Sequence, residues 1–270
     1  MNETASPKIL DYRPLRGREL KWLAALAGLL ALLAGLYLVW LPDVRELRKK
    51  NPQATSFMLI KERQALARGR KLPRVMLWRD YDEISENLRH AVLVSEDQDF
   101  YRHKGVDWES TRAALADDWK KKRLAKGGST ITQQLARNLY LSPSKNPLRK
   151  IKEILIARRL EKELGKRRIL ELYLNVAEWG RGVYGAEAAA RTYFDKSAAD
   201  LTPEEGAALA AVLPSPRRYS PVKDTRFMER QKARIVSRMR ASGYLPEEEP
   251  PEEEVVVSSE TEVWSSSATY

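Results

Sequence analysis

The run Gly127-Gly128-Ser129-Thr130-Ile131-Thr132-Gln133-Gln134-Leu135-Ala136-Arg137-Asn138 is the most informative stretch of this chain. Ser129 could cap a helix that follows the two glycines. The next residues are β-branched or amides, which are mediocre helix formers, so their clustering needs another reason. Gln133 and Gln134 donate and accept hydrogen bonds, and Arg137 lies one helical turn after Gln133. The run predicts a polar wall that contacts sugar hydroxyls and phosphate oxygens.

A second unusual run, Glu96-Asp97-Gln98-Asp99-Phe100-Tyr101-Arg102-His103-Lys104-Gly105, precedes the first by about thirty residues. An acidic cluster of this kind can be a solvated helix end followed by a loop. The apolar segment 91–94 favours a different reading, because it delivers Glu96 from the core to a cleft. Burial there raises the pKa of a carboxylate toward the value of a general base.

A third block, Arg149-Lys150-Ile151-Lys152-Glu153, lies in a predicted helix. Asn146 followed by Pro147 is a strong start signal, and Gly165 is a candidate stop. Glu153 falls on the same arc as the apolar residues that follow it, so it is either buried with a partner or faces a cleft. Read in isolation, the block is a charged helix face with an Arg149–Glu153 pair.

Composition restricts the classes of partner and chemistry. The chain has 270 residues, a net charge of +11 and no cysteine, which excludes thiol catalysis, disulfides and Cys-based zinc sites. Residues 246–270 contain eight Glu and no Lys or Arg, so the rest is more basic than the total suggests. Such a body predicts an anionic partner: nucleic acid, lipid head groups or a phosphorylated substrate.

An uncharged run from Trp22 to Leu41 is long enough to cross a bilayer as a helix. Arginines and a lysine precede it, which favours a cytoplasmic N-terminus and a translocated body. A cleaved signal peptide is the alternative, but its apolar core is usually only ~7–15 residues long. Basic residues at 45–50 also flank the C-terminal side of the run, which does not fit the tendency of positive charge to stay on the cytoplasmic side.

Six segments are predicted along the chain. They are a cytoplasmic tail (1–21), a transmembrane signal anchor (22–41), a membrane-proximal connector with some helix (42–73), a mainly helical catalytic domain (74–225), a C-terminal helix (226–245) and an acidic disordered tail (246–270). A short strand is expected at 75–78. Further helices are expected at 168–175, 185–194 and 203–213, and a glycine-punctuated loop at 180–185.

Five blocks in this order resemble the peptidoglycan glycosyltransferases (glycosyltransferase family 51), which polymerise the glycan strands of bacterial cell walls. The blocks are Glu96-Asp97-x-x-Phe100-x-x-His103-x-Gly105, Gly128-Ser129-Thr130-Ile131-Thr132-Gln133-Gln134-Leu135, Arg149-Lys150-x-x-Glu153, Ile169-Leu170-x-x-Tyr173-Leu174-Asn175 and Leu213-Pro214-Ser215-Pro216. The resemblance covers about residues 80–220, and chance does not account for a second block of that length.

The resemblance implies a lysozyme-like, mainly α fold with a small jaw lobe resting on the membrane. It implies polymerisation of lipid II with inversion and release of undecaprenyl diphosphate. Glu96 would be the general base, and Glu153 a second carboxylate that positions the diphosphate or a metal. The substrate-binding residues would be Asp97, Phe100, His103, Ser129, Thr132, Gln133, Gln134, Arg137, Asn138, Lys145, Arg149 and Lys150.

Two of these positions depart from the family pattern: Arg137 stands where Lys is usual, and Lys145 where Arg is often found. Both keep the positive charge, although their geometries differ. The resemblance also implies Mg²⁺ as an aid to the diphosphate, with Glu153 as a possible ligand. The expected partners are lipid II, the growing glycan chain, the membrane and other cell-wall synthases, and not nucleic acid. The expected location is the bacterial inner membrane, with the catalytic domain on its periplasmic face.

The resemblance is closest to members without a transpeptidase domain, because only about fifty residues follow position 221. Residues 180–190 also look like those monofunctional members. Trp108, Trp119 and the basic run 120–123 fall where the jaw is expected. The alternative function is a lytic transglycosylase or lysozyme-like hydrolase on a similar scaffold. A third reading is a membrane-anchored scaffold whose basic surface recruits anionic partners.

Overall fold

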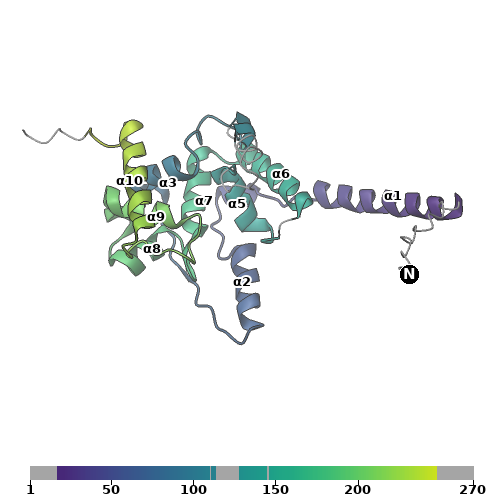
Figure 1. Ribbon diagram of the computed structural model, residues 1–270, viewed down its shortest axis with the longest axis horizontal. Coiled ribbons are helices and arrows are strands. Elements are labelled where there is room, and N and C mark those ends of the chain that lie inside the picture. Colours follow the sequence, from purple (N-terminus) through teal and green to yellow (C-terminus); the bar gives the residue numbers. More distant parts are fainter. Residues whose placement is uncertain (1–16, 110, 114–127, 145, 248–270) are drawn as a thin grey trace, which may run out of the picture.

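The computed structural model describes residues 17–247 except 110, 114–127 and 145. Its first element is a long helix, α1 (Gly17–Val39), which projects from the body (Figure 1). The segment Leu20–Val39 is apolar and long enough to span a membrane, and its side chains are almost all exposed. Because a water-soluble helix does not leave such a surface uncovered, α1 fits a single-pass membrane anchor, close to the predicted 22–41.

The connector contains two short elements, a 3₁₀ helix η1 (Arg45–Arg48) and helix α2 (Ser56–Leu66). Thr55 starts α2 by accepting a hydrogen bond from the backbone N–H of Met58 at 3.2 Å. Met58 itself is fully buried in the core. The connector therefore packs against the helical body through α2.

The body is mainly helical, as predicted. Its helices are α3 (Glu86–Glu96), α5 (Ile131–Tyr140), α6 (Pro147–Glu163), α7 (Lys166–Val176), α8 (Ala186–Phe194), α9 (Pro203–Val212) and α10 (Arg226–Ala241), with 3₁₀ turns η2 (Tyr81–Glu83) and η3 (Ala198–Asp200). The cap signals are confirmed at two starts: Asn146 caps α6 ahead of Pro147, and Thr202 forms a capping box on α9.

Helix α6 ends at Glu163, close to the predicted stop at Gly165, which with a φ of −75° also serves as the N-cap of α7. One local expectation is wrong. The glycine-rich segment expected as a loop is a small hairpin, β2 (Glu178–Gly180) and β3 (Val183–Tyr184). The predicted strand at 75–78 is present as β1 (Val75–Met76), which pairs in parallel with β3. The sheet order is β1-β3-β2.

Helix packing brings the distant polar runs together. Helix α3 packs against α9 and α10, while α5 packs against both α6 and α7 (Figure 1). Apolar residues such as Leu88, Leu135 and Leu160 are fully buried between them. As a result, the C-terminal end of α3 meets the first turns of α5, beside α7.

Several predicted features lie outside the described residues. These are Lys145, Trp119 with the basic run 120–123, the N-terminal residues to 16 and the acidic tail from 248. The predicted jaw falls largely on this gap. Trp108, at its described edge, is exposed.

Candidate active site

Glu96 is the last residue of α3, where the helix delivers it to the meeting point with α5. Its Oε2 accepts a hydrogen bond of 2.8 Å from Nε2 of Gln134. Burial raises the pKa of Glu96 above its ordinary value, although the Gln134 hydrogen bond and the charge of Arg137 pull the pKa down. Such a carboxylate holds a proton more readily than a solvated one, which suits a general base.

Glu96 borders a small cavity of about 190 Å³, here called the Glu96 cavity. Its other lining residues come from the end of α3, the loop after it, the start of α5 and helix α10; they include Asp97, Ser129, Thr130 and Arg238. Arg238 reaches across from α10 and donates a hydrogen bond to the carbonyl oxygen of Val94. The general-base candidate therefore faces a space with both acidic and basic walls.

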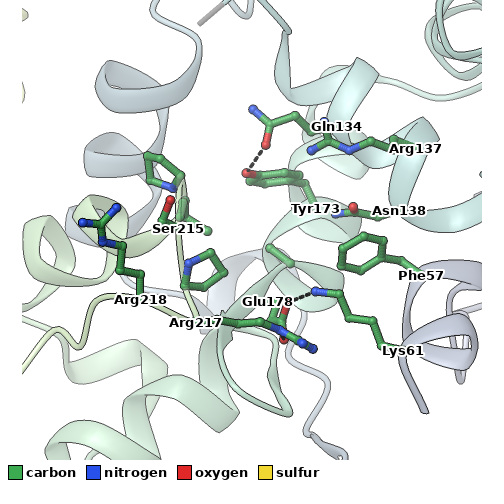
Figure 2. Close-up of a pocket in the computed structure, with 14 residues that line it drawn as sticks. Phe57, Lys61, Gln134, Arg137, Asn138, Tyr173, Glu178, Ser215, Arg217 and Arg218 are labelled. Carbon is green, nitrogen blue, oxygen red and sulfur yellow. Dashed lines mark hydrogen bonds and ion pairs between the residues drawn. The ribbon is translucent and has the colours of Figure 1, made fainter. Parts of the chain in front are cut away.

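A larger cavity, of about 370 Å³, lies on the other side of Gln134; we call it the α5–α7 cavity (Figure 2). It is strongly cationic, since Arg137, Arg217, Arg218 and Lys61 line it against one carboxylate, Glu178. Lys61 and Arg217 both bind Glu178, at 2.5 and 2.9 Å. This leaves the cavity with a net positive charge that suits a phosphate-bearing ligand.

Three members of this cavity wall were not anticipated from the sequence. Lys61 comes from the connector helix α2, Glu178 from β2, and Arg217 from the segment after α9. They are far apart in the chain, so only the fold reveals that they form one ion cluster. The neighbouring block Leu213-Pro214-Ser215-Pro216, which carries part of the resemblance, also lines this cavity.

Glu153 lies in the middle of a cluster of cations on α6. It has no exposed surface, and its two oxygens bind Nη1 of Arg149 and Nζ of Lys150, each at 2.5 Å. Lys150 also donates to Oγ of Ser129 at 2.8 Å. Because buried charges are stable only when paired, Glu153 holds the two cations in place beside the start of α5.

The two glutamate clusters share Ser129. Its hydroxyl accepts from Lys150, and its carbonyl oxygen lies 3.5 Å from Nε2 of Gln134, which donates to Glu96. The base candidate and the cation cluster thus belong to one polar surface.

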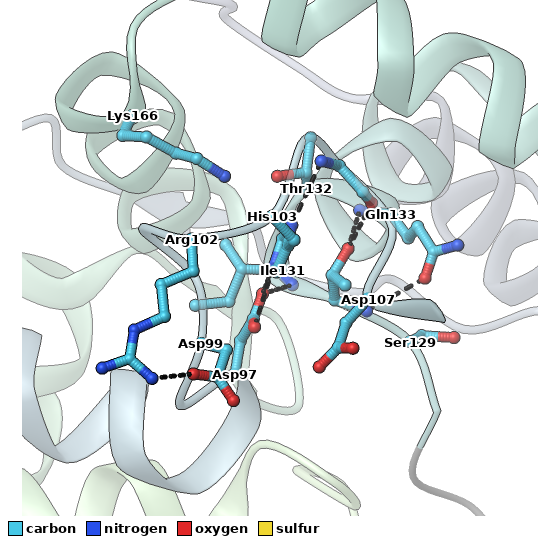
Figure 3. A network of polar contacts seen from close by, with 12 residues as sticks. Asp97, Asp99, Arg102, His103, Asp107, Ser129, Ile131, Thr132, Gln133 and Lys166 are labelled. Atoms are coloured by element: carbon cyan, nitrogen blue, oxygen red, sulfur yellow. Dashed lines mark hydrogen bonds and ion pairs between the residues drawn. The ribbon is translucent and has the colours of Figure 1, made fainter. Parts of the chain in front are cut away.

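An interior network ties the two sequence runs together (Figure 3). Oδ2 of Asp97 accepts from the backbone N–H of Ile131 at 2.9 Å, and His103 Nε2 lies 2.9 Å from Oδ1. Nδ1 of His103 accepts from the backbone N–H of Gly105, so the proton sits on Nε2. Thr130, the N-cap of α5, donates to the carbonyl oxygen of Gly105 at 2.7 Å.

Not every residue predicted to bind substrate reaches a cavity. Gln134, Arg137 and Asn138 line the α5–α7 cavity, and Ser129 lines the Glu96 cavity. Asp97 also lines the Glu96 cavity, and the His103 side chain paired with it is 8% exposed. Phe100, Thr132 and Gln133 are buried and line neither of these two cavities.

Phe100, Thr132 and Gln133, which were predicted to bind substrate, make contacts inside the protein. Phe100 has no exposed surface and packs under the ammonium of Lys166. Thr132 donates to Glu161 at 2.6 Å, and Gln133 accepts from the backbone N–H of Thr130 at 3.0 Å in the capping box of α5. These side chains support the residues that line the two cavities. The expectation that Ser129 caps α5 is also wrong, because Thr130 does.

The described residues do not fit a resident metal at Glu153. Among them there is no group of three or more His, Cys, Asp or Glu side chains that could hold an ion. Both oxygens of Glu153 are engaged by cations, which a divalent ion would have to displace.

Comparison with known proteins agrees with this architecture. Residues 64–240 match the transglycosylase family. A biosynthetic peptidoglycan transglycosylase of Alcanivorax borkumensis is 45% identical over 222 residues, covering 82% of this chain and 87% of the relative. Proteins of the same name from Dechloromonas aromatica (45%, covering 84% of this chain and 97% of the relative) and Chromobacterium violaceum (46%, covering 78% and 92%) are similarly close. With its lysozyme-like helical domain, this chain belongs to the transglycosylase family.

Proposed function

We propose that this protein is a peptidoglycan glycosyltransferase that extends glycan strands from lipid II and releases undecaprenyl diphosphate. The observation that carries the proposal is the pairing of a partly buried, hydrogen-bonded carboxylate, Glu96, with two separate groups of cations. The relatives are named for peptidoglycan transglycosylation, and 87–97% of the length of the first two is matched.

In the proposed reaction, Glu96 takes the proton from the 4-hydroxyl of the acceptor sugar. The oxygen then forms a bond to the anomeric carbon of the donor from the opposite face to the leaving group. The bond between that carbon and the phosphate oxygen breaks, its electron pair leaves with the diphosphate, and the configuration inverts. The raised pKa of Glu96 supports this step, since a base of higher pKa accepts the hydroxyl proton more readily.

The cations would stabilise the charge that develops on the diphosphate. Arg137 in the α5–α7 cavity and the Arg149–Lys150 pair on α6 are the candidates. Lys145 remains a prediction of the same kind. Mg²⁺ also remains a prediction, although both oxygens of Glu153 are already bound by Arg149 and Lys150.

The α1 helix supports placement in a membrane, where the lipid-linked substrate resides. We propose the bacterial inner membrane, with the catalytic body on the periplasmic face and the growing glycan chain as second partner. Other cell-wall synthases are further proposed partners.

A lytic or hydrolytic enzyme on this scaffold would also use a glutamate, but would need no phosphate-binding cations. The two cation groups beside Glu96 therefore favour synthesis over cleavage. The Glu96 carboxylate disfavours a purely structural scaffold, because a scaffold has no use for a carboxylate whose pKa is raised by burial at a cavity.

The test is polymerisation of labelled lipid II by the full chain in detergent micelles. Glu96→Gln should reduce the rate by at least about a hundredfold, the usual scale for loss of a general base, while the helical content stays unchanged. Glu204→Gln, at an exposed position on α9, is the matched control and should keep full activity. An active Glu96→Gln enzyme would overturn the assigned base. Shortening of finished glycan without polymer growth would instead support the hydrolase.

A further inference from the structure

Tyr173 is buried directly behind the Gln134–Glu96 contact. It lies on α7, has 1% of its surface exposed, and donates its hydroxyl proton to Oε1 of Gln134 at 3.0 Å (Figure 2). The other end of the same amide, Nε2, donates to Glu96 at 2.8 Å. The three side chains form one directed chain of hydrogen bonds from α7 through α5 to the end of α3.

The direction of this chain depends on the Tyr173 hydroxyl. An amide has one donor end and one acceptor end, and its terminal torsion is soft, so Gln134 can in principle present either end to Glu96. A hydroxyl that donates to Oε1 holds the NH₂ end toward the carboxylate. The reverse orientation would place Oε1 against the oxygens of Glu96 and Ser129 and would disfavour the ionised base.

We propose that Tyr173 is a positioning residue that sets the proton affinity of Glu96 by fixing the orientation of the Gln134 amide. It does not touch the reacting atoms and acts only through Gln134. The proposal deepens the function proposed above, since it assigns a tuning element to the same base.

Burial keeps Tyr173 in the form that this role requires. The pKa of its hydroxyl is raised well above the ordinary value of 10.0 because the side chain is desolvated. The hydroxyl therefore remains protonated, and remains a donor, throughout the range in which Glu96 titrates.

Other charged groups also act on Glu96, and the test must leave them in place. They are Arg137 on α5, Asp97, Asp99 and Asp107 in the segment after α3, and Arg238 on α10. Tyr173→Phe removes one neutral hydroxyl and changes none of these charges. A shift in the titration of Glu96 in this variant would therefore come from a changed orientation of the Gln134 amide and not from a change in the surrounding charges.

The direct test is a titration of the Glu96 carboxyl by ¹³C NMR in the full chain in detergent micelles. The Glu96 signal is identified by its loss in Glu96→Gln. In Tyr173→Phe the ionisation constant of Glu96 should fall about threefold to tenfold, the effect of weakening one hydrogen bond to a carboxylate. Tyr193→Phe is the matched control, because its hydroxyl points to the carbonyl oxygen of Trp179 and it should leave the titration unchanged.

A double-mutant cycle separates positioning from general disturbance. With Gln134→Ala as background, Tyr173→Phe should cause no further shift, because the amide through which Tyr173 acts is gone. An unchanged titration in the Tyr173→Phe single variant, or a full shift that persists without Gln134, would overturn the proposal.

The rate profile gives a second readout. Tyr173→Phe should lower polymerisation most on the acidic side and approach the wild-type rate at high pH, where Glu96 is ionised in both proteins. A uniform, pH-independent loss would indicate a merely structural role and contradict the proposal. The NMR titration does not depend on turnover, so a wild-type chain that fails to polymerise lipid II would refute the proposed function and leave the Tyr173 result standing.

Discussion

Glu96 is held in surroundings that disfavour its charge, and this has a consequence for folding as well as for chemistry. Its pKa is raised from the ordinary 4.5 because burial outweighs the hydrogen bond from Gln134. The folded state therefore binds this proton more tightly than the unfolded chain does. Stability from this group is complete at low pH and is lost as the pH rises from 4.5 through the raised pKa.

Replacing Glu96 with Gln should remove this pH dependence. At pH 7.5 the variant is expected to melt at a higher temperature than the wild type, by a few degrees, and the difference should vanish as the pH approaches 4.5. Thermal denaturation of the full chain in detergent at several pH values measures it. Glu204→Gln, which removes an exposed carboxylate, should show no comparable gain. A Glu96→Gln protein that melts no higher than the wild type at pH 7.5 would contradict the expectation.

Some of the residues at the candidate site were predictable from the sequence, and others were not. A carboxylate at a cleft, Glu96, and a polar wall that includes Arg137 were predicted from local patterns of apolar and polar residues. The roles of Arg149 and Lys150 came only from the family resemblance. Glu153 was expected either to be buried with a partner or to face a cleft, and it is buried. The role of Tyr173 was not predicted, since it depends on a contact between residues 39 positions apart. The burial of Phe100, Thr132 and Gln133 was not predicted, because a motif does not indicate which of its side chains point inward.

Among the helices and strands, the start of α5 is notable because its cap residue, Thr130, also contacts the segment after α3. Thr130 accepts from the backbone N–H of Gln133 and also donates to the carbonyl oxygen of Gly105. The helix that it starts carries Gln134 and Arg137 into the site. The position of the cap thus sets the position of both side chains.

Thr130→Ala should therefore lower stability and activity together. We expect a loss of about 1–2 kcal/mol in unfolding free energy, the usual cost of removing a cap, with a several-fold lower polymerisation rate. Thr202→Ala is the matched control, because it removes an equivalent capping box on α9, away from the cavities. It should cost similar stability without the loss of rate. Equal rate losses in both variants would show that α5 is not specially coupled to the site.

The starts of helices were predictable where the sequence has a capping residue followed by proline. Asn146-Pro147 and Thr202-Pro203 place the starts of α6 and α9 correctly. Helix α6 ends close to the predicted stop at Gly165, and because α7 follows at once, the same glycine also serves as the start of the next helix. The β2–β3 hairpin escaped notice because strands of two or three residues are too short to show alternation.

On the scale of the whole molecule, the anchor meets the catalytic body at Lys152. This lysine on α6 is only 5% exposed, and its ammonium donates to the carbonyl oxygen of Tyr37 in the last turns of α1 at 2.7 Å. The rings of Tyr37 and Trp40 lie 3.9 and 5.3 Å from it. A cation at a helix C-terminus between two aromatic faces is a favourable arrangement.

The same helix carries Arg149, Lys150 and Glu153, so this joint should set how the site is held relative to the bilayer. Lys152→Ala is expected to reduce polymerisation of lipid II embedded in vesicles about threefold to tenfold, on the scale of a lost hydrogen bond and cation–π contact. Its rate in detergent micelles should change little. Lys162→Ala, at an exposed position on the same helix, should behave as wild type in both. Equal losses in vesicles and micelles would argue against a positioning role for the joint.

The Asp97–His103–Gly105 network bears on how mutational data for this protein are to be interpreted. These residues hold the end of α3 against the start of α5, so we expect that altering them displaces Glu96 and Gln134, in addition to any effect on a substrate contact. An inactive Asp97 or His103 variant is then ambiguous evidence about chemistry. Screens of this protein should measure melting temperature beside turnover, and assign a chemical role only to positions where turnover falls while the melting temperature does not.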